Sequence, residues 1–241
     1  MRISKLSLPV WLREGCVIVA SILLAFGIDA QWELSRERSD AKVLLELLRS
    51  DFAATVAEAE RVYANHAGGL HAAEQLIFMA EEDALTPADA SRVDRHLSVM
   101  MVSGASFDPP LGTVQSLIQS GRLSQIAEPT LIAMLTAWPS EVEDLKQQED
   151  SFGGSFGALG EALTTMGTRM DWLVATDHVG ADIGPLPWKS QTTESWRHLD
   201  DPNLSMALAN YWLGMRFTVK AAEQRLERSK EILSALEATE R

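Results

Sequence analysis

The chain has 241 residues, 46% hydrophobic and 23% charged, so it can bury a sizeable core as one large domain or two small ones. Its formal net charge of −13 argues against nucleic acid as a partner, because phosphate backbones are bound by clusters of Lys and Arg. The lone cysteine, Cys16, excludes an internal disulfide and a thiolate metal site. Residues 1–32 carry a net charge of +1 and the remainder −14, a pattern typical of an exported or anchored acidic domain.

An apolar run lies near the start of the chain. Gly15 to Ile28 is 14 residues without a charge, whereas a membrane span takes about 20. Between its flanking tryptophans the segment is 22 residues, or about 33 Å as a helix, and tryptophan favours membrane interfaces. The charged residues lie in the end turns, where charge is tolerated more easily than at the bilayer centre. We therefore expect these residues at the membrane interface: Trp11, Arg13, Glu14, Asp29 and Trp32.

Three interpretations of this run compete: a buried core helix, a signal peptide cleaved near Ala25–Ala30, and an uncleaved membrane anchor. The helical pattern continues without Pro or Gly from Gly27 to Gly68, which favours the anchor. We expect residues 1–32 to form an N-terminal tail and transmembrane anchor. Residues 33–241 would form an extracytoplasmic helical bundle, held off the membrane by the long first helix.

The anchor also predicts an orientation and partners. Basic residues are similar in number on both sides, and the free amino terminus favours a cytoplasmic N-terminus, with the main domain in the periplasm of a bacterial inner membrane. Small residues let membrane helices approach closely, although they can equally face lipid. The candidate packing residues are Cys16, Ala20, Ser21, Ala25 and Gly27. The expected partners are the lipid bilayer and other membrane proteins or a second copy of the chain.

The rest of the chain predicts helices without an internal repeat. The fold class is therefore all-α: an N-terminal transmembrane helix continuing into an antiparallel helical bundle. We expect the first helix over about 9–65, a turn at Gly68-Gly69, and helices over about 70–82, 87–103 and 111–120. Thr86 and Pro87 open one of these helices, and Gly121 ends another in a left-handed cap.

Two long helices follow. One starts near Glu128-Pro129 and runs toward 150, with a kink or restart at Pro139. The glycines over 151–163 lack the strand and the Gly-Lys-Ser/Thr ending of a phosphate loop, so they favour a helix against which another helix packs closely. The last helix opens at Asp201-Pro202. Its predicted core face consists of Leu204, Leu208, Tyr211, Trp212, Met215, Val219, Leu226 and Leu233.

The longest irregular segment, Asp177 to Ser205, holds three prolines and two tryptophans. It is a candidate ligand or partner loop, although it can simply cap the bundle. The candidate residues in it are Asp177, His178, Trp188, Trp196 and His198. No serine or cysteine signature accompanies the Asp-His pair, and His71 with Glu74 is half of a di-iron motif without its second copy. We therefore expect no catalytic, cofactor or metal site.

Two stretches resemble an uncharacterised family of bacterial single-pass membrane proteins, a domain of unknown function. The first runs from Ala20 to Phe52, and the second, "FDPPLGTVQSLIQSGRLSQIAEPTLIAMLTAW", from Phe107 to Trp138. The family often has two asparagines before its tryptophan, where this chain has Asp29, Ala30 and Gln31. The matching positions in the first stretch are Ile28, Asp29, Trp32, Glu33, Arg36, Arg38, Leu44, Leu48, Asp51 and Phe52. The resemblance implies the topology and brings no catalytic residue.

These observations predict a non-enzymatic, membrane-anchored interaction or accessory protein, a subunit or partner of a larger membrane complex. The alternative is a periplasmic ligand-binding or sensing bundle that works through a partner protein. A periplasmic hydrolase using His178 is the least favoured hypothesis.

Overall fold

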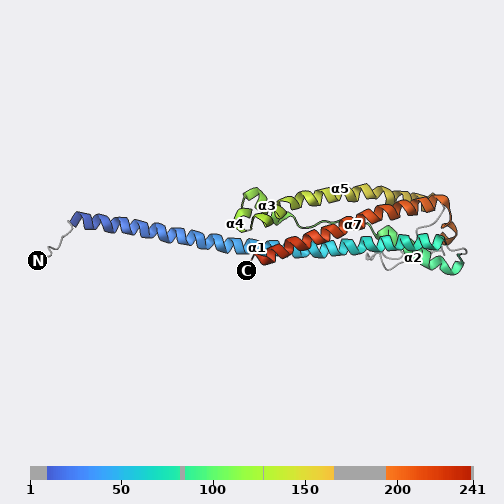
Figure 1. Ribbon diagram of the computed structural model, residues 1–241, viewed down its shortest axis with the longest axis horizontal. Coiled ribbons are helices and arrows are strands. Elements are labelled where there is room, and N and C mark those ends of the chain that lie inside the picture. The colour runs from blue at the N-terminus through green and yellow to red at the C-terminus, as the bar shows by residue number, and fades with distance from the viewer. Residues whose placement is uncertain (1–9, 82–84, 127, 166–193, 240–241) are drawn as a thin grey trace, which may run out of the picture. The chain divides into compact units, whose positions relative to one another are not determined.

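The computed structural model describes residues 10–81, 85–126, 128–165 and 194–239 (Figure 1). Within its helices, the side chains at 10–18, 20, 34, 125, 126, 148, 150–152 and 155 are not described. The chain divides into two units, Met1–Leu47 and Leu48–Arg241. The described residues form helices and no strand, which confirms the all-α prediction. The elements are α1 (Val10–Ala80), η1 (Pro87–Asp89), α2 (Ala90–Val102), α3 (Gly112–Ser120), α4 (Leu123–Ile126), α5 (Pro129–Thr165), η2 (Ser195–His198) and α7 (Pro202–Ala238).

The second unit is built on the part of α1 from Leu48 onward, α5 and α7, which lie side by side (Figure 1). The Arg49 guanidinium donates to the Leu236 carbonyl at 2.8 Å, and further along α1 the Trp212 indole donates to Glu74 at 3.4 Å. Because contacts advance along α1 as they retreat along α7, the two helices are antiparallel. The predicted antiparallel arrangement is therefore present for this pair.

Two apolar layers fill the interior of this unit. In one, the Trp138 ring lies 5.7 Å from Phe52 of α1 and 6.2 Å from Phe107, measured between ring centroids. In the other, the end of α1 packs with α2, α5 and α7. Its fully buried members include Leu76, Leu97, Leu159, Leu163, Leu208, Tyr211 and Met215. Each buried large side chain contributes about 1.5–3 kcal/mol by leaving water.

Helix ends follow the predicted capping chemistry. The Asp201 carboxylate accepts from the Asn203 backbone N–H at 2.8 Å, with Pro202 at the first position of α7. Gly121 ends α3 with φ of 68°, the left-handed conformation that glycine adopts without strain. The backbone N–H of Thr86 donates to Asp89 at 3.1 Å before α2. These local signals were sufficient to place three helix boundaries.

The predicted turn at Gly68-Gly69 is wrong, because α1 continues through both residues to Ala80. A Cβ built on Gly69 would lie 2.8 Å from the Tyr211 hydroxyl oxygen and would also clash with the Ser103 side chain. The hydroxyl of Tyr211 donates to the Met100 carbonyl at 2.9 Å, so the ring cannot easily move away. Gly69 therefore permits close packing of α1 against α2 and α7 rather than a change of chain direction.

The long α5 corrects two further expectations. The helix includes Pro139 and continues to Thr165 without the expected restart. Its glycine-rich part is helical as predicted, but a Cβ at Gly153, Gly154 or Gly157 would meet nothing within 4 Å. Close helix packing is therefore not the reason for these three glycines.

In the first unit, none of the side chains described over residues 19–47 is buried. Leu44 and Leu45 are half-buried. The large apolar residues that are 48–76% exposed are Val19, Ile22, Leu23, Leu24, Phe26, Ile28, Trp32, Val43 and Leu47. Among the residues whose side chains are described, which begin here at Val19, no helix has an apolar stretch long enough to cross a membrane. The described structure therefore does not support the expected transmembrane helix.

The two adjacent glycines of α1 make a matched pair for mutation. Gly69→Ala is expected to destabilise the second unit by about 1–3 kcal/mol, because its methyl group would overpack the contact with Ser103 and Tyr211. Gly68→Ala meets nothing within 4 Å and is expected to stabilise by about 0.5–1 kcal/mol through helix propensity. Urea unfolding of the full chain in mild detergent, followed by circular dichroism, measures both. Equal effects at the two positions would contradict the close-packing role of Gly69.

Candidate functional site

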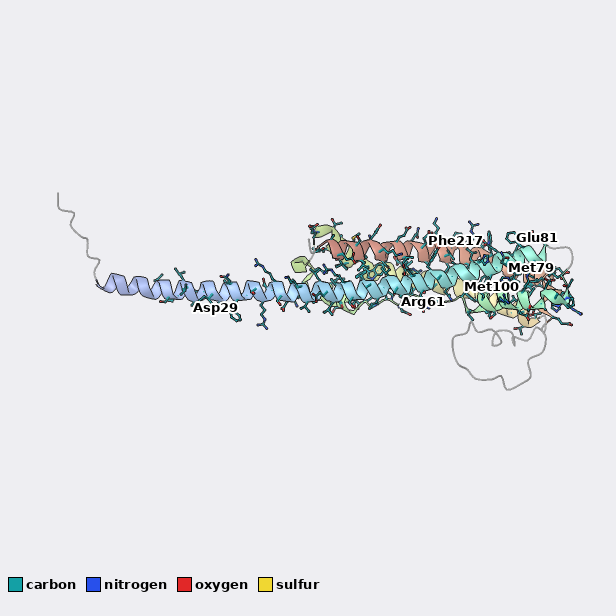
Figure 2. All side chains as sticks on the ribbon, turned by 90° about the horizontal axis from the view of Figure 1, so that it is seen from below. Asp29, Arg61, Met79, Glu81, Met100 and Phe217 are labelled. Atoms are coloured by element: carbon teal, nitrogen blue, oxygen red, sulfur yellow. The ribbon has the colours of Figure 1, made fainter. Side chains whose placement is uncertain are left out.

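Several of the predicted membrane-face residues lie on the described part of α1. Asp29, which is labelled in Figure 2, and Trp32 are exposed, as are Ser21, Ala25 and Gly27. A Cβ at Gly27 would meet nothing within 4 Å. The remaining candidates are residues whose side chains the structure does not describe: Trp11, Arg13, Glu14, Cys16 and Ala20.

The predicted loop site is only partly described. Asp177, His178 and Trp188 lie outside the described residues. Trp196 belongs to η2, where it packs against the core cluster and lies 5.2 Å from the Arg197 guanidinium carbon. His198 is half-buried in the same short helix. Trp196 therefore contributes to the bundle interior. The predicted pocket with Trp188 lies outside the described residues.

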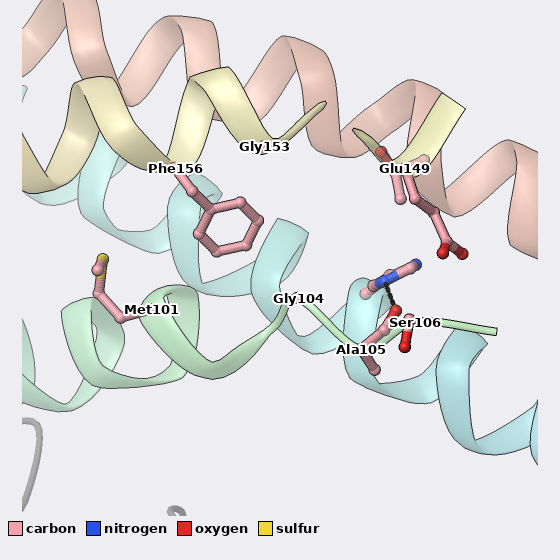
Figure 3. A pocket seen from close by; sticks show the side chains of 9 residues that line it. Met101, Gly104, Ala105, Ser106, Glu149, Gly153 and Phe156 are labelled. Atoms are coloured by element: carbon pink, nitrogen blue, oxygen red, sulfur yellow. Dashed lines mark hydrogen bonds between the residues drawn. The ribbon is translucent and has the colours of Figure 1, made fainter. Parts of the chain in front are cut away.

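A cavity of about 410 Å³ lies instead near the middle of the second unit (Figure 3). His66 of α1 and Thr218 of α7 line it, together with residues that follow α2. In Figure 3, Phe156 and Glu149 point from α5 toward the segment that contains Gly104, Ala105 and Ser106. The complete lining is His66, Met101, Gly104, Ala105, Ser106, Glu149, Gly153, Phe156 and Thr218. This cavity brings together polar groups from three long helices.

His66 is the most deeply buried polar group of this lining, at 2% exposure. Its Nε2 lies 2.9 Å from the Ala105 carbonyl oxygen, so Nε2 carries the proton and donates. Burial lowers the pKa of His66 below its ordinary value of 6.5, with Arg225 and Arg61 acting in the same direction and Ala105 and Glu149 against it. The neutral ring therefore presents Nδ1 as a buried acceptor, which has no hydrogen-bond partner among the described residues.

The neighbouring Asn65 holds the same backbone segment. Its amide nitrogen donates to the Val102 carbonyl at 3.2 Å, and its side-chain oxygen accepts from the Ala105 N–H at 3.1 Å. These bonds and that of His66 satisfy backbone groups that the end of α2 leaves unpaired. Two consecutive side chains of α1 thus fix the irregular segment that forms one wall of the cavity.

Glu149 and Arg225 form a buried ion pair beside the cavity. Arg225 Nη1 lies 2.6 Å from Glu149 Oε1, and the two side chains are 2% and 15% exposed. The guanidinium also lies 5.3 Å from the centre of the Phe107 ring, within the range of a cation–π interaction. The backbone N–H of Phe107 donates to the other carboxylate oxygen at 3.4 Å. One carboxylate therefore links α5, α7 and the segment before α3.

Metal-binding geometry is not found in the described part of the chain, where no group of three or more His, Cys, Asp or Glu side chains comes together. Glu74 accepts from the Trp212 indole, and His71 is exposed. The half di-iron motif that these two residues form in the sequence has no further ligands among the described side chains.

Sequence reasoning missed His66, Glu149 and Arg225 as a constellation. The predicted core face of the last helix is correct as far as Val219, but beyond it the fully buried residues are Ala222, Arg225, Ser229, Ile232 and Leu236. The available signal was the helical spacing of these small and apolar residues around Arg225. No local pattern linked that arginine to an acid 76 positions earlier.

Comparison of the sequence with protein-family models, with curated proteins and with solved structures finds no match. The resemblance to the single-pass membrane family therefore stays a prediction from the two stretches that carry it.

The Glu149–Arg225 pair predicts an asymmetry between two ion pairs that join the same helices. Glu149→Gln leaves a buried guanidinium without its counter-ion and is expected to cost about 3 kcal/mol in the free energy of unfolding. Glu141→Gln breaks the more exposed pair with Arg228 and is expected to cost under about 1 kcal/mol. Urea unfolding of both full-length variants checks the ranking, and equal costs would contradict it.

The lowered pKa of His66 predicts loss of stability in mild acid. Below pH 6.5 the unfolded chain binds a proton at this residue and the folded chain does not, so stability falls as pH drops toward the lowered folded pKa. His66→Gln is expected to reduce the difference in unfolding free energy between pH 7.5 and pH 5.5, by up to about 1.4 kcal/mol per pH unit of the window.

His96 supplies the control for this measurement. Burial lowers its pKa as well, and His71, Arg92 and Arg95 act in the same direction. His96→Gln should therefore remove a separate part of the pH dependence, and the two effects should add because the residues share no hydrogen-bond partner among those described. An unchanged pH dependence in His66→Gln would refute a neutral buried His66.

Proposed function

We propose that the chain is a membrane-anchored, non-enzymatic helical interaction protein. The apolar run at its start would insert in a bacterial inner membrane, with the N-terminus cytoplasmic and the bundle periplasmic. The bundle would act as an accessory subunit or partner of a larger membrane complex.

The distribution of exposed apolar residues in the first unit carries this proposal. At 100° per residue, Val19 and Ile22 lie on one side of the helix and Leu24 and Ile28 on the opposite side, and all four are at least half exposed. A helix that is apolar all round requires an apolar environment on every side. A single neighbouring helix covers one stripe, whereas lipid covers the whole circumference, so this arrangement favours a bilayer.

The residues that follow have a different pattern. Trp32, Val43 and Leu47 are exposed, and helical geometry places them on one stripe. A single apolar stripe on a helix typically packs against a partner helix. This supports interaction with another membrane protein or with a second copy of the chain just outside the membrane.

The second unit also carries an exposed apolar face. Met206, Leu213 and Phe217 are 50–69% exposed and share one side of α7 (Figure 2 labels Phe217). Exposed apolar residues gathered on one face are typical of surfaces that bind proteins. They support the interaction role over catalysis.

Ile22→Arg tests the anchor. An arginine near the centre of the span costs about 2.5–3.5 kcal/mol, which a run with only 14 uncharged residues cannot easily offset. The wild-type full chain is expected in the membrane pellet after carbonate washing, and Ile22→Arg is expected largely in the supernatant. Leu47→Arg, also exposed on α1 but outside the run, is the matched control and should stay in the pellet.

Three outcomes would contradict the proposal. Release of the wild-type chain by carbonate, or a mature N-terminus after Ala25–Ala30, would remove the anchor. Failure of a periplasm-specific reporter fused at Arg241 would overturn the orientation. Purification of the detergent-extracted wild-type chain would then identify the proteins that bind it.

A second candidate function is a ligand-binding or sensing bundle that works through a partner protein. The cavity beside His66 favours it, because a buried acceptor without a partner is usually satisfied by a ligand or water in native proteins. This function is compatible with the anchor and concerns a different part of the chain.

A further inference from the structure

The cavity lined by His66, Glu149 and Phe156 has the size of a small-ligand site. Its volume of about 410 Å³ lies at the lower end of the range for ligand pockets, about 300–1,000 Å³. Met101 and Phe156 give it an apolar wall, while His66 and Glu149 provide polar groups. Such a combination of apolar surface and a few polar groups binds small molecules in a fixed orientation.

The side-chain hydrogen-bond donors described in this lining are already used within the protein. The Nε2 proton of His66 goes to the Ala105 carbonyl. The Thr218 hydroxyl donates to the Gly214 carbonyl at 3.1 Å, and the Ser106 hydroxyl donates to Asp108 at 3.2 Å. What remains at these three side chains are lone pairs: the Nδ1 of His66 and two hydroxyl oxygens.

Glu149 adds further acceptor capacity. A carboxylate has about four lone-pair positions. Arg225 occupies one at 2.6 Å, and the Phe107 N–H makes only a long contact of 3.4 Å to the second oxygen. Arg225 itself does not line the cavity, so a ligand would contact Glu149 and not the guanidinium, although the positive charge of Arg225 reaches the lining, where it acts on His66. The cavity therefore presents acceptors and a carboxylate to whatever enters it.

We propose that this cavity binds a small primary amine with an apolar body, in its protonated form. An ammonium group has three N–H donors, which match the Glu149 carboxylate and the hydroxyl oxygens of Ser106 and Thr218. The apolar body packs against Met101 and Phe156, whose ring also attracts a cation. An organic anion would meet a carboxylate and no free side-chain donor among the described residues of this lining, and an alcohol would satisfy only one acceptor.

The proposal rests on the second candidate function, the ligand-binding bundle, and is tested with four compounds of similar shape. These are 2-phenylethylammonium, 2-phenylethanol, 3-phenylpropionate and trimethyl-2-phenylethylammonium, which keeps the charge but has no N–H. Calorimetry with the full chain in detergent is expected to show 2-phenylethylammonium binding at least about tenfold more tightly than each of the others.

Two adjacent glycines of α5 locate the binding. Gly153 lines the cavity and Gly154 does not, and both are exposed with nothing within 4 Å of an added Cβ, so neither substitution needs to disturb the core. Gly153→Phe is expected to weaken binding of the amine at least about tenfold by filling the cavity, and Gly154→Phe to leave the affinity within about twofold. Circular dichroism of both variants checks that the helices remain.

The possible outcomes distinguish an error in the proposed ligand class from an error in the ligand-binding function. If the carboxylate, the alcohol or the trimethyl compound binds more tightly than 2-phenylethylammonium, and Gly153→Phe blocks that binding, the cavity is a ligand site but the proposed ligand class is wrong. Equal losses in Gly153→Phe and Gly154→Phe would place the binding elsewhere and overturn the proposal. No saturable binding of any compound at millimolar concentration would overturn both the amine and the ligand-binding bundle.

Discussion

The burial of the Arg225 guanidinium is the constraint on which the second unit depends. Arginine stays protonated at any physiological pH, so a buried arginine must have its charge compensated where it lies. Glu149 of α5 supplies the counter-charge at 2.6 Å, and the ring of Phe107 lies against the same guanidinium. Sliding α5 by one turn along α7 would separate the pair by about 5 Å. One charge thus fixes the register between two helices and the position of the chain segment before α3.

The other polar contacts of the bundle agree with that register. Toward the C-terminus of α7, Arg228 pairs with Glu141, and Arg49 of α1 holds the Leu236 carbonyl. Toward its N-terminus, Tyr211 reaches the Met100 carbonyl over Gly69. Apolar layers alone would tolerate several registers, because Leu, Ala and Val surfaces pack in many ways. The polar contacts at intervals select one, and the cavity lies where His66 and Glu149 leave acceptor positions unfilled.

Local chemistry predicted much of the fold, and its failures share one cause. The helix-capping residues act on their neighbours in the chain, so their roles could be predicted from the sequence. These residues are Asp201, Pro202, Gly121 and Pro87. Gly69 gave the signal of a turn, but its contacts with the distant residues Ser103 and Tyr211 are what require glycine. The roles of His66 and Arg225 are likewise set by distant partners, Ala105 and Glu149. One sequence cannot reveal such pairs, because the residue types alone do not say which helices meet.

The two units differ in which side chains they bury and which they expose, and this difference bears on the environment that each requires. The second unit buries even an arginine, whose charge Glu149 compensates, and a histidine. The first unit leaves Val19, Ile22, Leu23, Leu24, Phe26 and Ile28 exposed. Covering large apolar side chains yields about 1.5–3 kcal/mol each when they are fully buried, so covering these six is worth on the order of 10 kcal/mol. That is comparable to the whole stability of a domain.

Covering the exposed apolar side chains of residues 19–28 is therefore worth more free energy than any single contact within the first unit. In the proposed anchor, lipid would provide this covering on all sides of residues 19–28, at the modest cost of Asp29 near one interface. Trp32, Val43 and Leu47, on a single stripe, need only one neighbouring helix. The change from an all-round to a one-sided apolar surface along a single helix is what a helix leaving a bilayer and meeting a protein partner would display.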